Sequence, residues 1–437
     1  MASWGLARSS FSVPALVAVM ACGACGRTGL LVFDDDVSPT ISAAGGNDRL
    51  DAGLDAEGGV LPTGLDAAII KVGDAEVAND QQIATGEAHA CLRTTKGDVF
   101  CWGANELGQL GDGTQTNRAT AAKVAGLPSI VRVAAGTHHT CALAVDESVW
   151  CWGGNSQGEQ GQGTMGDPVL APTKVPLPGV IGITAGGYHT CAHDAQGHSY
   201  CWGRNIYGEC GAQGAAHVVT PKPVPSLGNV LEIAAGWDHT CAVMSDRTVQ
   251  CFGRNQDGQI GNGTSGSTEI NPQVAIGVTG ARALFAGDDH TCAILVDGTM
   301  QCWGDNENGE LGAGAALYAD KALRCVGMAD AYQGGGGREH SCVATGGGTV
   351  LCWGANTGCQ VGIGQPCGVG VGIVKVPTQV ANIDDARWVA TGEVFSCAAH
   401  RVRGAVCWGQ NDRGQLGGGD MNDYGDRPGV ATEVLGL

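Results

Sequence analysis

Short apolar runs recur along this chain at intervals of about fifty residues, and each run fits a β-strand. Two examples are residues 131–136 and 231–236, and both runs end on a Gly. In the first copy the run at 83–86 is followed by strand-like segments at 89–93, 98–102 and 122–124. A Gly-containing turn at 95–97 separates the second segment from the third. Four strands in a repeat of this length are typical of a β-propeller blade.

Cysteine pairs mark the same repeat seven times. Each pair is a Cys, nine further residues, a second Cys, an aromatic residue and a Gly, and the first Cys residues lie 50, 50, 50, 51, 50 and 55 positions apart. The pairs are Cys91 with Cys101, Cys141 with Cys151, Cys191 with Cys201, Cys241 with Cys251, Cys292 with Cys302, Cys342 with Cys352, and Cys397 with Cys407. We therefore predict an all-β fold, a seven-bladed β-propeller over residues 80–437. The ring is expected to close where residues 431–434 meet residues 80–86.

The hairpin geometry predicts that each Cys pair forms a disulfide. A three-residue loop at 95–97 with Gly97 in the left-handed region places Cys91 opposite Cys101. The two residues then form a non-hydrogen-bonded pair, in which side chains approach most closely. Gly197, Gly298 and Gly348 occupy the same loop position in other copies. In the remaining copies this position is not Gly but Glu147, Arg247 or Arg403. Those turns either have a different conformation or hold a strained non-Gly residue.

Composition points to an oxidising compartment and away from nucleic acid. Twenty Cys residues are too many for a reducing cytosol. The chain has 24 Lys and Arg against 43 Asp and Glu, a net charge of −19, and no basic stripe. A nucleic-acid partner is therefore not expected.

The N-terminus has the features of an export signal. Arg8 precedes an apolar stretch at 11–21 that is too short to cross a bilayer. The stretch ends Val19-Met20-Ala21-Cys22, which resembles a bacterial lipoprotein cleavage box. We predict a lipoprotein-type signal peptide at 1–21, lipidation of Cys22, and a location as an outer-membrane or periplasmic lipoprotein or as a secreted protein. The alternative is an ordinary signal peptide in which Cys22 and Cys25 have no lipid role.

Residues 22–79 read as a flexible linker rich in Asp, Ala and Gly. Between positions 34 and 80 there are 11 acidic residues against Arg49 and Lys71, with no sustained period of a helix or strand. The three consecutive Asp residues at 34–36 are interpreted as solvent-exposed carboxylates rather than as a calcium site.

The remaining Cys residues and the repeated His and Trp residues are interpreted as structural. Cys210 replaces an apolar residue and is expected to be buried, Cys325 lies near a fourth strand, and Cys359 and Cys367 either bridge each other or take part in a metal site. A His repeated in every blade is spread around the ring, so a hydrogen bond to backbone is expected instead of metal binding or catalysis. These His residues are His89, His139, His189, His239, His290 and His340, with Phe395 in the seventh copy. The Trp residues after the second Cys are expected to pack between blades, and no cofactor or metal is expected.

The consensus G-x-x-H-T-C-A-x8-C-W-G-x-N-x-x-G-Q-L-G-x-G resembles the repeat of the regulator of chromosome condensation family. The best copies are residues 139–163 and 289–314. The resemblance covers residues 80–437 and implies a seven-bladed propeller, here of a secreted, disulfide-containing bacterial branch. The eukaryotic namesake of the family is a nuclear exchange factor for a small GTPase, which an exported chain would not meet. A secreted bacterial relative inhibits β-lactamases through loops on one propeller face.

We expect a binding module that uses variable stretches between the repeated scaffold positions. Its partner would be a protein or glycan in the cell envelope or outside the cell, with the membrane contacted only through the lipid anchor and the chain a monomer. The stretches are 112–123, 162–174, 212–223, 262–273, 313–321, 363–378 and 418–428. One alternative is a regulator that resembles the exchange factor, and another is a propeller enzyme acting on polysaccharide. The candidates for catalysis, Asp288, Asp289, Arg338 and Glu339, lie in ordinary turn positions, so an enzyme is not expected.

Overall fold

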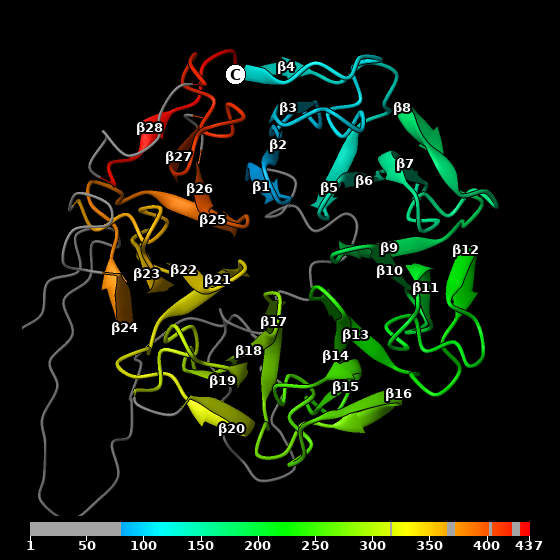
Figure 1. The fold of residues 1–437 in the computed structure, drawn as a ribbon, viewed down its shortest axis with the longest axis vertical. Coiled ribbons are helices and arrows are strands. Elements are labelled where there is room, and N and C mark those ends of the chain that lie inside the picture. The colour runs from blue at the N-terminus through cyan, green and yellow to red at the C-terminus, as the bar shows by residue number, and fades with distance from the viewer. Residues whose placement is uncertain (1–79, 315–316, 365–371, 402–403, 422–428) are drawn as a thin grey trace, which may run out of the picture. The chain divides into compact units, whose positions relative to one another are not determined.

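The described part of the molecule is a ring of seven β-sheets around a central axis (Figure 1). The computed structural model describes residues 80–314, 317–364, 372–401, 404–421 and 429–437. Each sheet has four strands, and every strand pairs antiparallel with its neighbours. The predicted all-β, seven-bladed propeller is confirmed. In these ranges no helix has the length and apolarity needed to cross a bilayer. The predicted signal peptide, Cys22, Cys25 and the linker lie outside the described residues.

The strands occupy four equivalent positions in the blades, numbered here from the axis outward. The first, innermost strands are β1 (Gln82–Thr85), β5 (Ile130–Ala135), β9 (Val180–Ala185), β13 (Val230–Ala235), β17 (Ala281–Ala286), β21 (Ala331–Gly336) and β25 (Ala386–Thr391). The second are β2 (His89–Arg93), β6 (His139–Ala144), β10 (His189–Asp194), β14 (His239–Met244), β18 (His290–Leu295), β22 (His340–Thr345) and β26 (Phe395–His400). The third are β3 (Val99–Gly103), β7 (Val149–Asn155), β11 (Ser199–Arg204), β15 (Val249–Asn255), β19 (Met300–Asp305), β23 (Val350–Ala355) and β27 (Ala405–Gly409). The fourth, outermost strands are β4 (Arg118–Lys123), β8 (Gly166–Lys174), β12 (His217–Pro223), β16 (Ser267–Val274), β20 (Tyr318–Arg324), β24 (Ile373–Gln379) and β28 (Thr432–Glu433).

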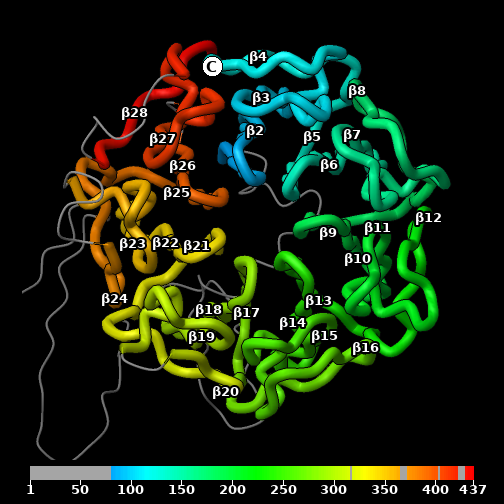
Figure 2. Tube along the Cα trace, in the orientation of Figure 1, coloured from blue at the N-terminus to red at the C-terminus, as the bar shows by residue number. Residues whose placement is uncertain are grey.

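The ring closure differs from the prediction. The chain passes once around the ring, and each blade is built from consecutive strands (Figure 2). Residues 432–433 pair with β27 in their own blade and not with the first strand. The first blade already has four strands of its own, so it has no vacant place for a strand from the C-terminus. Instead, the last blade packs against the first around a shared buried apolar cluster. The backbone N–H of Ala121 also donates to the carbonyl of Leu435 at 2.8 Å, and the indole N–H of Trp102 donates to the carbonyl of Gln415 at 3.0 Å.

Seven disulfides tie the second strand of each blade to the third. The two Cys residues of each pair are directly opposite in the strand register, with Cα atoms 4.0–4.1 Å apart. This separation is typical of a non-hydrogen-bonded pair, so the predicted pairing is confirmed in every blade. The bridges join Cys91 to Cys101, Cys141 to Cys151, Cys191 to Cys201, Cys241 to Cys251, Cys292 to Cys302, Cys342 to Cys352, and Cys397 to Cys407.

The other Cys residues of the propeller differ in state. Cys210 and Cys325 are free thiols in the core, as expected for Cys210 from the apolar residue that it replaces. Cys359 is disulfide-bonded, whereas Cys367 lies outside the described residues.

In the turns between the second and third strands, two of the three non-glycine residues adopt the strained left-handed conformation, which is one of the two predicted alternatives. Gly97 has φ 80°, and Glu147 and Arg247 both have φ 63°. L-residues avoid this left-handed region because Cβ approaches the backbone too closely. Arg403, the third exception, lies outside the described residues.

We expect Arg247→Gly to raise the free energy of unfolding by roughly 0.5–1 kcal/mol. Relief of about 1–2 kcal/mol of backbone strain exceeds the entropy that a Gly adds to the unfolded chain, about 0.4–1 kcal/mol. The midpoint of urea unfolding measures the change. Gly97→Ala should act in the opposite direction, because a Cβ there would lie 2.3 Å from Ser129 Oγ. A lower midpoint for Arg247→Gly would contradict the assignment of strain.

The repeated His residues join neighbouring blades through side chains. Each of the six His residues places Nε2 2.8–2.9 Å from a Thr or Ser hydroxyl of the next blade. The predicted hydrogen bond of each His to the backbone is therefore wrong, because the partner is a side-chain hydroxyl. The hydroxyl in turn donates to a main-chain carbonyl of the His-bearing blade, as Thr140 Oγ1 does to Gln109 O at 2.9 Å. Since that proton is used, Nε2 must be the donor. Burial lowers the pKa of each of these His residues well below 6.5, so each ring is neutral.

The Trp residues reach the same carbonyls, as predicted for packing between blades. The Trp152 indole donates to Gln109 O at 2.9 Å, so one carbonyl accepts from both the Thr and the Trp of the following blade. At the junction of the last blade with the first, Phe395 replaces the His and Ala90 replaces the hydroxyl residue. Both are fully buried. Both members of the hydrogen-bonded pair of His and hydroxyl residue are thus replaced together at this junction by two apolar residues.

Candidate functional site

One face of the propeller carries the parts of the repeat that differ between blades. We call it the loop face. It consists of the inner turns, which join the first and second strands of each blade, and the outer loops, which join the third and fourth. Each inner turn contributes the two residues between the repeated Gly and the following strand, such as Glu87-Ala88 and Trp237-Asp238. The first residues of all seven pairs line the mouth of the central channel.

Backbone hydrogen bonds hold the inner turns in a ring. At six of the seven blade junctions an N–H in one turn donates to a carbonyl in the next, at 3.1–3.4 Å, as Thr137 does to Gly187. In all seven blades the carbonyl of the second turn residue accepts an N–H from the third strand or the residue directly after it, at 2.7–3.0 Å. The turn backbones are therefore fixed, and the side chains they present differ from blade to blade.

Aromatic side chains occupy the inner turns of the second, third and fourth blades. The rings of His138 and Tyr188 meet edge to face with centroids 6.3 Å apart, and those of Tyr188 and Trp237 do so at 5.6 Å. Gly187 allows this approach, because a Cβ there would lie 2.7 Å from Trp237 O and 3.1 Å from the Trp237 ring. The row is partly exposed on the loop face.

Arg204 links this row to the outer loop of the third blade. Its guanidinium carbon lies 4.8 Å from the centroid of the Tyr188 ring and 6.0 Å from that of Tyr207. Nε of Arg204 is 3.0 Å from the buried Glu209 carboxylate, and an ion pair with Asp238 holds the other side of the group. We define the aromatic patch as Tyr188, Arg204, Ile206, Tyr207 and Trp237. Ile206 in this patch is 57% exposed.

The inner turns of the remaining blades are mainly acidic. Burial raises the pKa of Asp288 to about 8, and the neighbouring Asp289 adds to the shift. Burial also raises the pKa of Glu87, while His138 at 3.7 Å opposes it. Arg338 forms ion pairs with Glu393 and Glu339 and is the cation among the inner-turn residues of these blades. The loop face therefore has an aromatic half and an acidic half.

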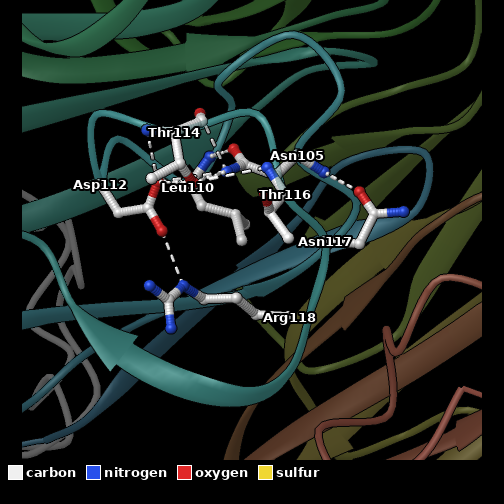
Figure 3. A network of polar contacts seen from close by, with 7 residues as sticks. All are labelled: Asn105, Leu110, Asp112, Thr114, Thr116, Asn117 and Arg118. Carbon is white, nitrogen blue, oxygen red and sulfur yellow. Dashed lines mark hydrogen bonds and ion pairs between the residues drawn. The ribbon is translucent and has the colours of Figure 1, made fainter.

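The outer loops are organised by an Asn that follows the repeated Trp and Gly. In every blade the Oδ1 of this Asn accepts an N–H from five residues ahead, as Asn105 does from Leu110 at 2.9 Å. In the first blade the Asn105 amide also donates to Asp112 and Thr114, and Asp112 accepts from Arg118 Nε at 2.6 Å (Figure 3). These contacts preorganise the loop.

Comparison with known proteins identifies the family. The model of the RCC1-like domain family matches residues 12–324. The chain belongs to this family.

Solved structures agree in fold with this RCC1-like propeller. Prp20p from Saccharomyces cerevisiae, described with its binding to Gsp1p and histones, is 24% identical over 74% of this chain and 82% of its own, with a TM-score of 0.65. Yeast RCC1 (Prp20) bound to Kap60 is 22% identical over 91% of both chains, with a TM-score of 0.69. Human WBSCR16 is 22% identical over 76% of this chain and 93% of its own, with a TM-score of 0.64. At these identities the likeness establishes the fold alone.

The structure divides the four variable stretches of the RCC1-like repeats that it describes in full, 112–123, 162–174, 212–223 and 262–273, into two parts. The first part is an outer loop, and the second lies largely in an outermost strand, such as β8 or β16. These stretches are thus not loops throughout. The four side chains considered for catalysis lie in the inner turns of the fifth and sixth blades. There Asp289 is held by Arg254 at 2.5 Å and by Gln259 at 2.7 Å, and Glu339 is 3.6 Å from Arg338.

Sequence reasoning missed the aromatic patch. Tyr188 and Trp237 precede repeated His residues, and Arg204 and Tyr207 flank a repeated Asn, so all four lie beside scaffold positions. The available signal was variation between the seven copies at the two residues before each His. No group of His, Cys, Asp and Glu that could hold a metal ion occurs in the described ranges.

Proposed function

We propose that this RCC1-like propeller is an exported protein-binding module whose aromatic patch anchors a protein partner. The observation that carries the proposal is the packing of Tyr188 and Tyr207 against Arg204, with Trp237 edge to face on Tyr188, on a rigid, partly exposed face. Tyr, Trp and Arg are the residues most enriched among the hot spots of protein interfaces. Fixed backbone turns keep the entropy loss on binding small.

The acidic half of the loop face supports a partner with basic residues next to an apolar surface. Glu87 and Glu393 lie at the channel mouth beside the aromatic row. Asp288 lies there too, but with a pKa of about 8 it is largely protonated at neutral pH. In a protein with a net charge of −19, this arrangement would steer a basic partner toward the patch.

Export and anchoring rest on separate observations. Seven buried disulfides favour an oxidising compartment. The sequence 1–22 supports cleavage before Cys22 and its lipidation. Prp20p, the protein in two of these structures, is described with proteins that it binds, which supports a protein partner over a glycan. The exchange-factor alternative rests on family resemblance alone.

Site-specific photocrosslinking tests the proposed surface. A photoreactive residue at Ile206 in the patch is compared with one at Val145 on the opposite face, because both side chains are 57% exposed. We expect one protein adduct of defined mass from cell-envelope extract or medium at position 206 and none at position 145. Equal labelling at both positions, or an adduct that glycosidase treatment removes, would reject the proposal.

Trp237→Ala and Tyr188→Ala should each weaken binding of the captured partner by about 30-fold or more, equivalent to about 2 kcal/mol for an interface hot spot. Trp150→Ala is the matched control, since Trp150 is another partly exposed Trp but lies in the third strand of the second blade. Surface plasmon resonance with the purified partner measures the affinities. Thermal unfolding of each variant separates lost binding from lost folding. A patch variant that folds and binds like the wild type would contradict the assignment.

A further inference from the structure

The central channel contains a cavity on the side of the inner-turn ring away from the loop face. Its volume is about 80 Å³, and residues of the innermost strands β5, β13, β17, β21 and β25 line it. In each innermost strand, the residue four positions before the repeated Gly of the inner turn faces the cavity region of the channel. This position is occupied by Gln82, Arg132, Gly182, Glu232, Ala283, Gln333 and Trp388. Neighbouring scaffold positions repeat, whereas this one differs between almost all blades, so the channel lining is asymmetric.

Arg132 is the charged group without a partner in this cavity. Its guanidinium lines the cavity and forms no hydrogen bond or ion pair with any residue that the structure describes. Burial lowers its pKa, and Glu232 opposes the shift from across the channel. The Arg132 side chain is half-buried, and its guanidinium has five N–H donors and no acceptor of its own. These donors have no partner among the described residues, so the site is suited to an anion that accepts them.

His193 enters the cavity from the second strand of the third blade. It can do so because Gly182 has no side chain: a Cβ there would lie 2.0 Å from His193 Nε2. His193 is only 4% exposed, and its Nδ1 has no hydrogen-bond partner in the described part of the chain. Burial lowers its pKa to about 4 with a further contribution from Arg132, so the ring is neutral and offers one N–H. His193 Nδ1 is therefore a second polar atom without a partner on a residue that lines the cavity.

The remaining walls are apolar or already engaged. Tyr332 and Trp388 present aromatic surface to the cavity. Arg282 donates to the carbonyls of Ala331 at 2.6 Å and Tyr332 at 2.9 Å. These bonds fix the position of the guanidinium but do not neutralise its positive charge. Burial raises the pKa of Glu232 to about 7, against the opposing effect of Arg132 and Arg282. Two cations thus face one partly protonated acid, and the cavity is electropositive within an acidic protein.

We propose that this cavity binds a small carboxylate through Arg132 and His193, with its hydrocarbon part against Tyr332 and Trp388. A carboxylate matches the planar fork of a guanidinium with two parallel hydrogen bonds. A single water needs about 10–15 Å³, so the cavity has room for an acid of a few carbon atoms. The Glu232 carboxyl group disfavours a doubly charged phosphate at the same place. This site is separate from the aromatic patch.

Isothermal titration calorimetry of the full protein with sodium propionate tests the proposal, with inorganic phosphate and sodium chloride at equal ionic strength as comparisons. We expect saturable binding of one propionate, and Arg132→Gln should weaken it at least 10-fold. Arg324→Gln is the matched control, since Arg324 is exposed on an outermost strand and should leave propionate binding unchanged. No saturable binding of propionate, phosphate binding tighter than propionate, or equal affinity in Arg132→Gln would each overturn the proposal.

A second variant keeps the test decisive if Arg132→Gln does not fold. Ala283→Leu adds bulk to the cavity wall and leaves every charge in place. It should reduce propionate affinity at least 10-fold while the circular dichroism spectrum stays that of the wild type. A folded Ala283→Leu protein that binds propionate like the wild type would show that the ligand does not occupy this cavity.

Discussion

Full reduction of the seven disulfides should remove most of the stability of this propeller. Each bridge closes a loop of about ten residues, which corresponds to about 2–3 kcal/mol in the chain-entropy model. Even at half that value, seven bridges amount to about 7–10 kcal/mol, comparable with the total stability of an ordinary domain, about 5–15 kcal/mol. Urea unfolding of the oxidised protein, and of protein reduced and alkylated in denaturant before refolding, measures the loss.

One bridge can be examined by comparing a double variant, Cys241→Ala with Cys251→Ala, against the single variant Cys210→Ala. All three side chains are buried, but Cys210 is a free thiol, so its replacement removes volume without removing a crosslink. We expect the double variant to lose about 2–3 kcal/mol more than the single one. Intact mass before and after reduction counts the bridges, and it also reports cleavage before Cys22 and any acyl group there. Free thiols at the fourteen paired positions of the native protein would contradict both the bridges and the argument for export.

Loss of the hydrogen bond between His290 and Ser341 should produce the second large decrease in the free energy of unfolding. This bond joins the fifth and sixth blades at 2.8 Å. Ser341→Ala leaves the His290 N–H buried without an acceptor and should cost about 1–3 kcal/mol. His290→Phe alone places a larger apolar ring against a hydroxyl. The double variant recreates the Phe395 and Ala90 pair of the junction between the last and first blades. Its loss should therefore be at least about 1 kcal/mol smaller than the sum of the two single losses. A double-mutant cycle in urea measures this coupling, and strict additivity would contradict it.

The same pair predicts a change in acid sensitivity. Burial lowers the pKa of His290 to about 4 in the folded protein, from 6.5 in the unfolded chain. Between these values the unfolded state binds a proton that the folded state does not, so stability falls as the pH drops below 6.5. From pH 7 to pH 5 this single group costs about 2 kcal/mol, since one pKa unit corresponds to about 1.4 kcal/mol. Wild type should lose about that much more stability over this range than the double variant with His290→Phe and Ser341→Ala. An equal loss in both proteins would show that His290 does not resist protonation.

Blade number, strand order and disulfide pairing followed from the sequence because these features are local. A hairpin of two strands and a three-residue turn brings Cys91 opposite Cys101 within eleven residues of chain. The spacing of the pairs then fixes how many such units exist. The strain at Glu147 and Arg247 was also visible, since a Gly occupies the same position in four other copies. In each case the residues that determine the geometry are neighbours in the chain.

Contacts between blades were decided only by the tertiary structure. The His residues bond a hydroxyl about fifty positions away, and the first and last blades meet through residues more than three hundred positions apart. No local pattern specifies the angle at which one blade packs on the next, so a backbone partner was expected for the His and a meeting of residues 431–434 with residues 80–86 for the closure. The joint replacement by Phe395 and Ala90 was a covariation inside the sequence that pointed to the true partner.

The amino-acid sequence by itself determined a sevenfold, disulfide-bonded propeller, because each blade is specified by residues that are close along the chain. Only the tertiary structure gathered Tyr188, Arg204 and Trp237 into one patch and brought Arg132, His193 and Glu232 to one cavity. The patch combines Tyr188 and Arg204 of the third blade with Trp237 of the fourth, and the cavity residues come from three blades that face a common axis. Closure of the ring converts variation between copies of a repeat into two distinct surfaces.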